Sequence, residues 1–264
     1  MTDTVRSNDG TTIAFDRSGH GPPLILVSGA MGTRAHAADL AAVLATTFTV
    51  FAYDRRGRGD SGDTQPYAVE REIEDLDAVI GAAGGSAFIY GHSSGAVLSL
   101  RAAAAGLAIP KLALHEPTLI IDDSRPAVAD DFLAHLDELI AADKRDEAVA
   151  FFMTDSVGMP PEAIPAMRQN ASWGRMTAVA QTLAYDSRVM ADTTRGDPAP
   201  LKQWAPVTIP ILVIDGTETF PFLHASADAL AAVLPNAERA TLEGQDHGPA
   251  PEVLAPVLVE FFGR

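Results

Sequence analysis

Short apolar, β-branched runs alternate along this chain with longer stretches rich in Ala and Leu, and this alternation restricts the fold more than any other feature. Each run is too short for a helix and is bounded by Gly, Pro or polar residues, as buried parallel strands are. The runs are residues 24–27, 48–53, 87–90, 112–115, 211–214 and the weaker 238–242. The pattern predicts an α/β fold, a mostly parallel central sheet flanked by helices.

The first strands and the flanking helices follow from local signals. Within residues 4–15, Asn8-Asp9-Gly10 supplies the positive-φ turn of a hairpin, so antiparallel strands are expected to open the sheet. Apolar residues at helical spacing predict helices around 34–45, 73–80, 96–105 and 251–262. These are the ordinary layer helices of such a fold.

Between Pro117 and about Pro206 the strand pattern stops and helical periodicity replaces it. Pro-rich breaks at 158–161 and 197–200 interrupt this stretch. We therefore expect a core built from residues 1–116 and 207–264, with residues 117–206 as a helical cap insertion over the sheet.

Composition indicates a globular protein and argues against two classes of partner. Hydrophobic residues make up 47% of the 264 residues and charged residues 20%, enough to bury a core. The formal charge of −16 has the wrong sign for nucleic acid or an anionic membrane surface, so neither is an expected partner. The absence of cysteine and the polar first ten residues favour a cytoplasmic location. The composition is compatible with a homodimer as well as with a monomer.

The segment Gly91-His92-Ser93-Ser94-Gly95 lies between the strand expected at 87–90 and a helical run. A G-x-S-x-G in that setting is the pattern of a nucleophile elbow, a strained turn that holds the serine hydroxyl above the sheet. Small residues at positions 91 and 95 let the strand and helix backbones approach. The pattern predicts Ser93 as a nucleophile, the alternative being an ordinary turn.

With this elbow the chain resembles the α/β-hydrolase superfamily, in particular its small capped esterase, lactonase and haloperoxidase-like branch. Residues 26–32 are similar to the family's oxyanion loop, and residues 53–62 to its D-x-R-G-x-G-x-S segment. The first loop begins Ser28-Gly29, where a common form begins His-Gly. The resemblance implies an oxyanion hole formed by the backbone N–H groups of Ser94 and Ala30, shared with Met31.

The resemblance also implies a general base near the C-terminus. Residues 243–249 follow the last expected strand, where the family carries its catalytic histidine, and they contain His247. Its task would be to take the Ser93 proton on attack and return it to the leaving group.

The family's usual acid is missing. Its G-x-x-D pattern after the strand at 211–214 reads G-T-E-T here, with Thr219 in place of the acid. Threonine carries no charge to stabilise an imidazolium, so the carboxylate comes from elsewhere or is absent. Glu116 is the first candidate, because it ends the strand at 112–115 on the edge where α/β ligands bind. Glu218 is the second, and the weaker alternatives are Asp122, Asp123 and Asp246.

A serine nucleophile argues against epoxide hydrolase and haloalkane dehalogenase chemistry, whose intermediates need a carboxylate nucleophile. We therefore expect a serine hydrolase that cleaves a small or medium, largely apolar carboxylic ester or lactone through an acyl-Ser93 intermediate, with no metal or cofactor. The alternatives are C–C bond hydrolysis, cofactor-free perhydrolysis, and a non-hydrolytic cyclase or ligand-binding protein on this fold. The residues expected to line the substrate pocket are Gly29, His92, Phe152, Trp173 and Met176.

Overall fold

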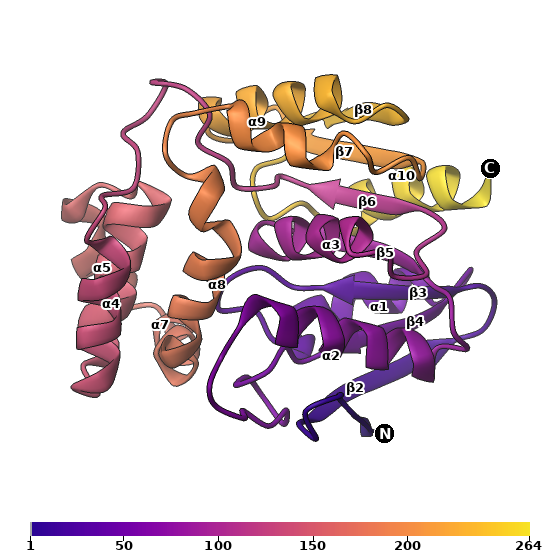
Figure 1. Cartoon of the computed structure of the whole chain (residues 1–264), viewed down its shortest axis with the longest axis horizontal. Coiled ribbons are helices and arrows are strands. Elements are labelled where there is room, and N and C mark those ends of the chain that lie inside the picture. The colour runs from indigo at the N-terminus through magenta and orange to yellow at the C-terminus, as the bar shows by residue number, and fades with distance from the viewer. Residues whose placement is uncertain (1) are drawn as a thin grey trace.

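The computed structural model describes residues 2–264, in which eight strands form one sheet with the order β1-β2-β4-β3-β5-β6-β7-β8 (Figure 1). The strand β2 runs antiparallel to β1 and β4, and all other neighbours are parallel. The mostly parallel sheet expected from the sequence is thereby confirmed. The strands are β1 (Thr2–Arg6), β2 (Thr12–Gly19), β3 (Pro23–Val27), β4 (Thr49–Tyr53), β5 (Phe88–His92), β6 (Leu112–His115), β7 (Ile211–Gly216) and β8 (Ala237–Leu242).

The expected N-terminal hairpin is also confirmed. Gly10 adopts a φ of 84°, and the Asp9 carboxylate accepts the backbone N–H of Thr11 at 2.9 Å. These two residues reverse the chain between β1 and β2, as an Asp-Gly turn does.

Helices cover both faces of the sheet, because the inner strands present apolar side chains on both sides. In β3, Ile25 and Val27 pack with α2 and α3, whereas Leu24 and Leu26 pack with α1 and α10. The helix α9 shares the face of α2 and α3. These layer helices are α1 (Ala38–Leu44), α2 (Val69–Ala82), α3 (Ser94–Ala104), α9 (Pro221–Val233) and α10 (Pro251–Gly263).

The helix expected at 34–45 begins later than predicted. Residues Arg34–Ala37 form a 3₁₀ turn, η1, and α1 starts at Ala38. The Arg34 backbone N–H donates to Asp54 at 2.8 Å, and its guanidinium pairs with Asp16, Asp54 and Asp60. These contacts tie the first turn to β2 and to the loop after β4. Helical periodicity does not contain this tertiary effect.

Between β6 and β7 the described chain is helical and contains no strand. Figure 1 shows α4, α5 and α7 beside the sheet, beyond the end at which β6 finishes, with α8 between them and the sheet. The α-helices are α4 (Phe132–Ala141), α5 (Arg145–Phe151), α6 (Ile164–Arg168), α7 (Ala171–Ala178) and α8 (Leu183–Met190). The π-helix η2 (Phe152–Val157) follows α5, and the 3₁₀ turns are η3 (Pro161–Ala163), η4 (Ala180–Thr182), η5 (Ala191–Thr193) and η6 (Ala199–Trp204). Within residues 2–264, no helix is long and apolar enough to cross a membrane.

Candidate active site

The segment from β5 to α3 forms a sharp turn at Ser93, whose φ of 57° and ψ of −124° are strained for a residue with a side chain. The Ser93 backbone N–H donates to the carbonyl of His115 at 2.9 Å, which ties the turn to β6. A Cβ at Gly95 would lie 2.5 Å from the carbonyl oxygens of Val27 and Ser28, so only glycine allows α3 to approach β3 this closely. The geometry is that of a nucleophile elbow.

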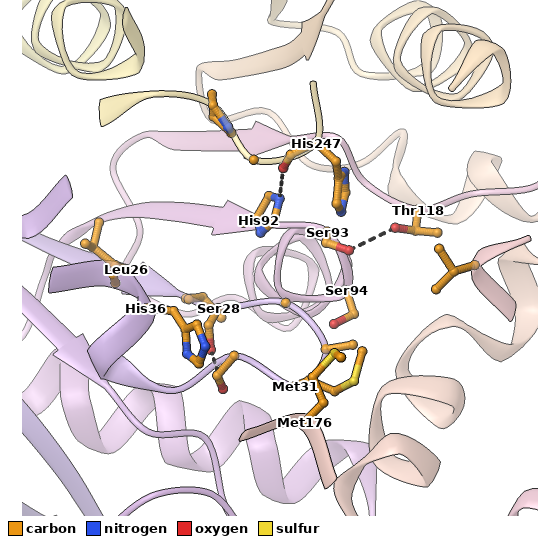
Figure 2. A pocket seen from close by; sticks show the side chains of 18 of the residues that line it. Leu26, Ser28, Met31, His36, His92, Ser93, Ser94, Thr118, Met176 and His247 are labelled. Atoms are coloured by element: carbon orange, nitrogen blue, oxygen red, sulfur yellow. Dashed lines mark hydrogen bonds between the residues drawn. The ribbon is translucent and has the colours of Figure 1, made fainter. Parts of the chain in front are cut away.

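The Ser93 hydroxyl faces a cavity and lies 3.1 Å from the hydroxyl of Thr118, as Figure 2 shows. Thr118 follows β6 and was not singled out from the sequence. No spacing relates it to Ser93, because the contact depends on β5 and β6 ending side by side.

His247 lies in the loop between β8 and α10, and its Nδ1 is 2.5 Å from Oε2 of Glu116. Because a carboxylate accepts hydrogen bonds, Nδ1 is the donor in this contact, and in the neutral imidazole Nε2 then carries the lone pair. Figure 2 shows the imidazole directed toward Ser93. In addition, His92 donates through Nε2 to the backbone carbonyl of His247 at 2.8 Å. This hydrogen bond connects the loop that carries His247 to the end of β5.

Glu116 is fully buried at the end of β6, in the left-handed region with a φ of 45°. Its Oε1 accepts the backbone N–H of Gly216 at 3.0 Å, and its Oε2 accepts the hydroxyl of Thr219 at 2.9 Å. Thr219, the residue in place of the family's usual acid, therefore supports the carboxylate that contacts His247. The other candidate acids, Glu218, Asp122, Asp123 and Asp246, are exposed.

The rings of two further histidines, His92 and His115, lie close to His247. The rings of His92 and His247 are 4.5 Å apart between centroids, and those of His92 and His115 are 5.1 Å apart. Burial, with repulsion from His247, lowers the pKa of His92 to about 3, and burial holds the pKa of His115 well below its usual value. Both rings are therefore neutral near pH 7.

The loop after β3 lies against Ser93. A Cβ at Gly29 would be 2.8 Å from the Cβ of Ser93, and Met31 adopts a φ of 59°. Ala30, Met31 and Ser94 all line the cavity at this point. The structure thus brings the expected oxyanion residues together beside the Ser93 hydroxyl.

The cavity has a volume of about 660 Å³ and is lined by segments from the whole chain. Its wall is mainly apolar, and four methionines contribute to it, Met31, Met153, Met176 and Met190. Of the expected pocket residues, Gly29, His92, Phe152 and Met176 line the cavity.

The structure gives Trp173 a different position from the expected one. Trp173 is not among the lining residues; it is buried, and its indole donates to Asp146 at 2.7 Å. His36, which was not among the residues expected in the pocket, lines the cavity. Helical spacing alone did not distinguish which side chains of the helices between β6 and β7 face the cavity.

Comparison with known proteins agrees with this geometry. The Alpha/beta hydrolase family matches residues 24–257. An alpha/beta hydrolase from Sphaerobacter thermophilus has a similar structure with a TM-score of 0.93 and 55% identity, covering 98% of this chain and 100% of that one.

Two less similar proteins have names that state an activity. A non-heme chloroperoxidase of Kitasatospora aureofaciens is 26% identical over 98% of this chain and 95% of its own length. An esterase from Rhodococcus shares the fold, with a TM-score of 0.73 and 22% identity over 99% of this chain and 98% of that one.

Proposed function

Because this chain belongs to the alpha/beta hydrolase family, we propose that it is a serine hydrolase whose catalytic residues are Ser93, His247 and Glu116. The observation that carries the proposal is the 2.5 Å contact between His247 Nδ1 and the buried Glu116 carboxylate, with the imidazole turned toward the elbow serine. Nucleophile, base and orienting acid are the three roles that acyl transfer requires.

In the proposed reaction, Nε2 of His247 takes the Ser93 proton as Oγ attacks the substrate carbonyl. The N–H groups of Ala30 and Ser94 stabilise the oxyanion of the tetrahedral intermediate, with Met31 beside them. The imidazolium, paired with Glu116, then protonates the leaving alcohol. Water hydrolyses the acyl-Ser93 intermediate by the same steps in reverse order, and the triad is restored.

The proposed substrate is a small or medium carboxylic ester or lactone with a largely apolar acyl part. A cavity of about 660 Å³ lies within the range of small-molecule sites, and its apolar wall favours an uncharged chain. The esterase name of a structural neighbour supports this class. The formal charge of −16 disfavours polyanionic substrates.

We also propose that residues 117–206 form a cap that selects the substrate. Thr118, Phe152, Met153, Met176 and Met190 of this segment contribute to the cavity wall. Transfer of this segment onto a related core should carry its chain-length preference with it, measured with a series of p-nitrophenyl esters. An unchanged preference would contradict the role.

Cofactor-free perhydrolysis is a second candidate, favoured by the 26% identity to a chloroperoxidase along nearly the whole chain. In it, hydrogen peroxide replaces water as the nucleophile on acyl-Ser93, releasing a peracid and free Ser93. Peracid formation from an ester and hydrogen peroxide, compared with ester hydrolysis under the same conditions, measures the ratio of the two reactions.

The main proposal is tested with a fluorophosphonate probe and with turnover of p-nitrophenyl acetate and butyrate. We expect Ser93→Ala to abolish labelling, and both Ser93→Ala and His247→Ala to lower kcat by about 10⁴-fold or more. His135→Ala, at an exposed histidine of α4, is the control and should behave as the wild type. Folded wild-type protein that is neither labelled nor active would favour a cyclase or a ligand-binding protein instead.

A further inference from the structure

Asp186, on α8, lies fully buried where the inserted helices meet the core, and three side chains donate to it. Its Oδ1 accepts Nη1 of Arg55 and the hydroxyl of Ser94, both at 2.7 Å, and its Oδ2 accepts Nη2 of Arg58 at 2.6 Å. Ser94 follows the nucleophile, so this carboxylate contacts the elbow directly.

Arg58 extends the same contacts to the loop after β3. Its Nη1 donates to the carbonyl oxygens of Gly29 at 2.6 Å and Gly32 at 3.1 Å. The C=O and N–H of a trans peptide point in opposite directions. An arginine that holds the Gly29 carbonyl therefore turns the N–H of Ala30, on the same peptide plane, away from Arg58.

The position of the loop makes that orientation relevant to the nucleophile. Gly29 lies so close to Ser93 that a Cβ on it would be 2.8 Å from the Ser93 Cβ. The N–H of Ala30 belongs to this loop, and the N–H of Ser94 belongs to the residue whose hydroxyl is bound by Asp186. Both oxyanion donors are thus connected to one buried carboxylate.

We propose that Asp186 and Arg58 are positioning residues that orient the backbone N–H groups of Ala30 and Ser94 in the oxyanion hole. The inference rests on the proposed function. Replacing a buried ion pair with apolar residues is often neutral or stabilising, so stability alone is a weak reason for this cluster. The rigid guanidinium of Arg58 contacts two backbone carbonyls and a carboxylate at once, and it thereby fixes the positions of these three groups relative to one another.

The chain offers a matched control in a neighbouring buried pair. Arg56 binds Asp75 through two contacts of 2.7 Å, and its other partners are Asp9 and the carbonyl of Arg71. None of these partners belongs to the loop or the elbow. Lysine at position 58 or 56 keeps the charge but cannot reproduce the fork.

The test compares Arg58→Lys with Arg56→Lys in p-nitrophenyl butyrate hydrolysis and in inhibition by a trifluoromethyl ketone, whose serine adduct carries an oxyanion. We expect Arg58→Lys to lower kcat about 10- to 100-fold with KM nearly unchanged, and to weaken inhibition by a similar factor. The effect should be smaller than the loss of a whole oxyanion donor, which costs about 10²–10³-fold, because the N–H group is misoriented and not removed. Arg56→Lys should leave both within about twofold, an expectation from its distance from the donors. Melting temperatures show whether the two variants are comparably stable.

A second variant keeps the inference testable if Arg58→Lys fails to fold. Ser94→Ala retains the backbone N–H and removes only the hydroxyl that Asp186 holds, and it should lower kcat about 10-fold, the lower end of the effect of losing one hydrogen bond to a charged group. Equal losses in Arg58→Lys and Arg56→Lys, or wild-type kcat in both Arg58→Lys and Ser94→Ala, would overturn the positioning role. If the wild type reacts with the fluorophosphonate probe and hydrolyses the ester, those results would leave the proposed function intact. A wild type that is inactive and unlabelled would contradict both the proposed function and the positioning role.

Discussion

At the scale of single residues, Glu116 combines a strained backbone with a carboxylate whose two oxygens both accept hydrogen bonds. Its φ of 45° directs the chain out of β6, and Gly216, Thr219 and His247 all contact its side chain. A carboxylate held by two protein donors has a fixed orientation toward the imidazole. This is the role expected of the acid in a serine hydrolase.

Replacing Glu116 with Gln should lower kcat by about 10³–10⁴-fold, because the amide keeps the shape of the side chain but no longer stabilises an imidazolium. The control is Glu218→Gln, at the exposed alternative acid, which should remain within about twofold of the wild type, as surface substitutions usually do. Both are measured with p-nitrophenyl butyrate. Loss of activity in Glu218→Gln together with an active Glu116→Gln would assign the acid to position 218.

The two histidines with lowered pKa values, His92 and His115, make stability depend on pH. An unfolded histidine binds a proton below about pH 6.5, whereas the pKa of folded His92 is about 3. The unfolded state therefore binds more protons than the folded state between these two pH values. The free energy of unfolding is highest above about pH 6.5 and falls as the pH drops toward 3. The slope is at most about 1.4 kcal/mol per pH unit for each such histidine.

Melting temperatures at pH 7, 6 and 5 test this dependence. His92→Gln retains a donor for the carbonyl of His247 and should show a shallower decline than the wild type. His135→Gln, at an exposed histidine, should decline as the wild type does. Equal slopes in all three proteins would contradict the role of His92.

At the scale of elements, the approach of α3 to β3 depends on the absence of side chains at the elbow. A Cβ at Gly95 would meet two backbone carbonyl oxygens at 2.5 Å, and backbone cannot move aside as a flexible side chain can. The same glycine lets the elbow and the loop after β3 lie together, so helix packing and the proposed oxyanion hole both require glycine at position 95.

Gly95→Ala should destabilise the protein by about 1–3 kcal/mol or more, the cost of overpacking a close contact, and should lower kcat with it. Gly81→Ala is the matched control, since Gly81 lies in α2 with open space around it. That change should be neutral or stabilise by up to about 1 kcal/mol, because alanine favours helix. Urea denaturation of the two variants measures the difference, and equal stabilities would refute the close contact.

At the scale of the whole molecule, the cavity is assembled from segments far apart in the chain. The loop after β3, the elbow, the helices between β6 and β7 and the loop carrying His247 each supply part of its wall. Methionine side chains adapt to ligands of different shape, so a wall with four of them suits an apolar acyl chain.

Met176→Ala should enlarge the cavity and move the preference for p-nitrophenyl esters toward longer acyl chains by a few-fold in kcat/KM, since about one methylene of space changes binding by roughly 1 kcal/mol. Met167→Ala is the control: Met167 is partly buried but is not among the lining residues. Its acyl-chain profile should match that of the wild type. A shift of equal size in Met167→Ala would show that the preference responds to general loosening.

The sequence alone was sufficient for the strand pattern, the opening hairpin and the strand–turn–helix setting of Ser93, because apolar periodicity and turn chemistry are properties of neighbouring residues. It left the choice among carboxylates open, since the contact of Glu116 with His247 spans 131 residues. It gave no sign of Asp186, which meets Ser94 across 92 residues, and it placed Trp173 in the pocket. Only the tertiary structure shows which carboxylate contacts His247, what Asp186 binds and which side chains line the cavity, because contacts between distant segments depend on where neighbouring strands end and how the helices between β6 and β7 pack on them.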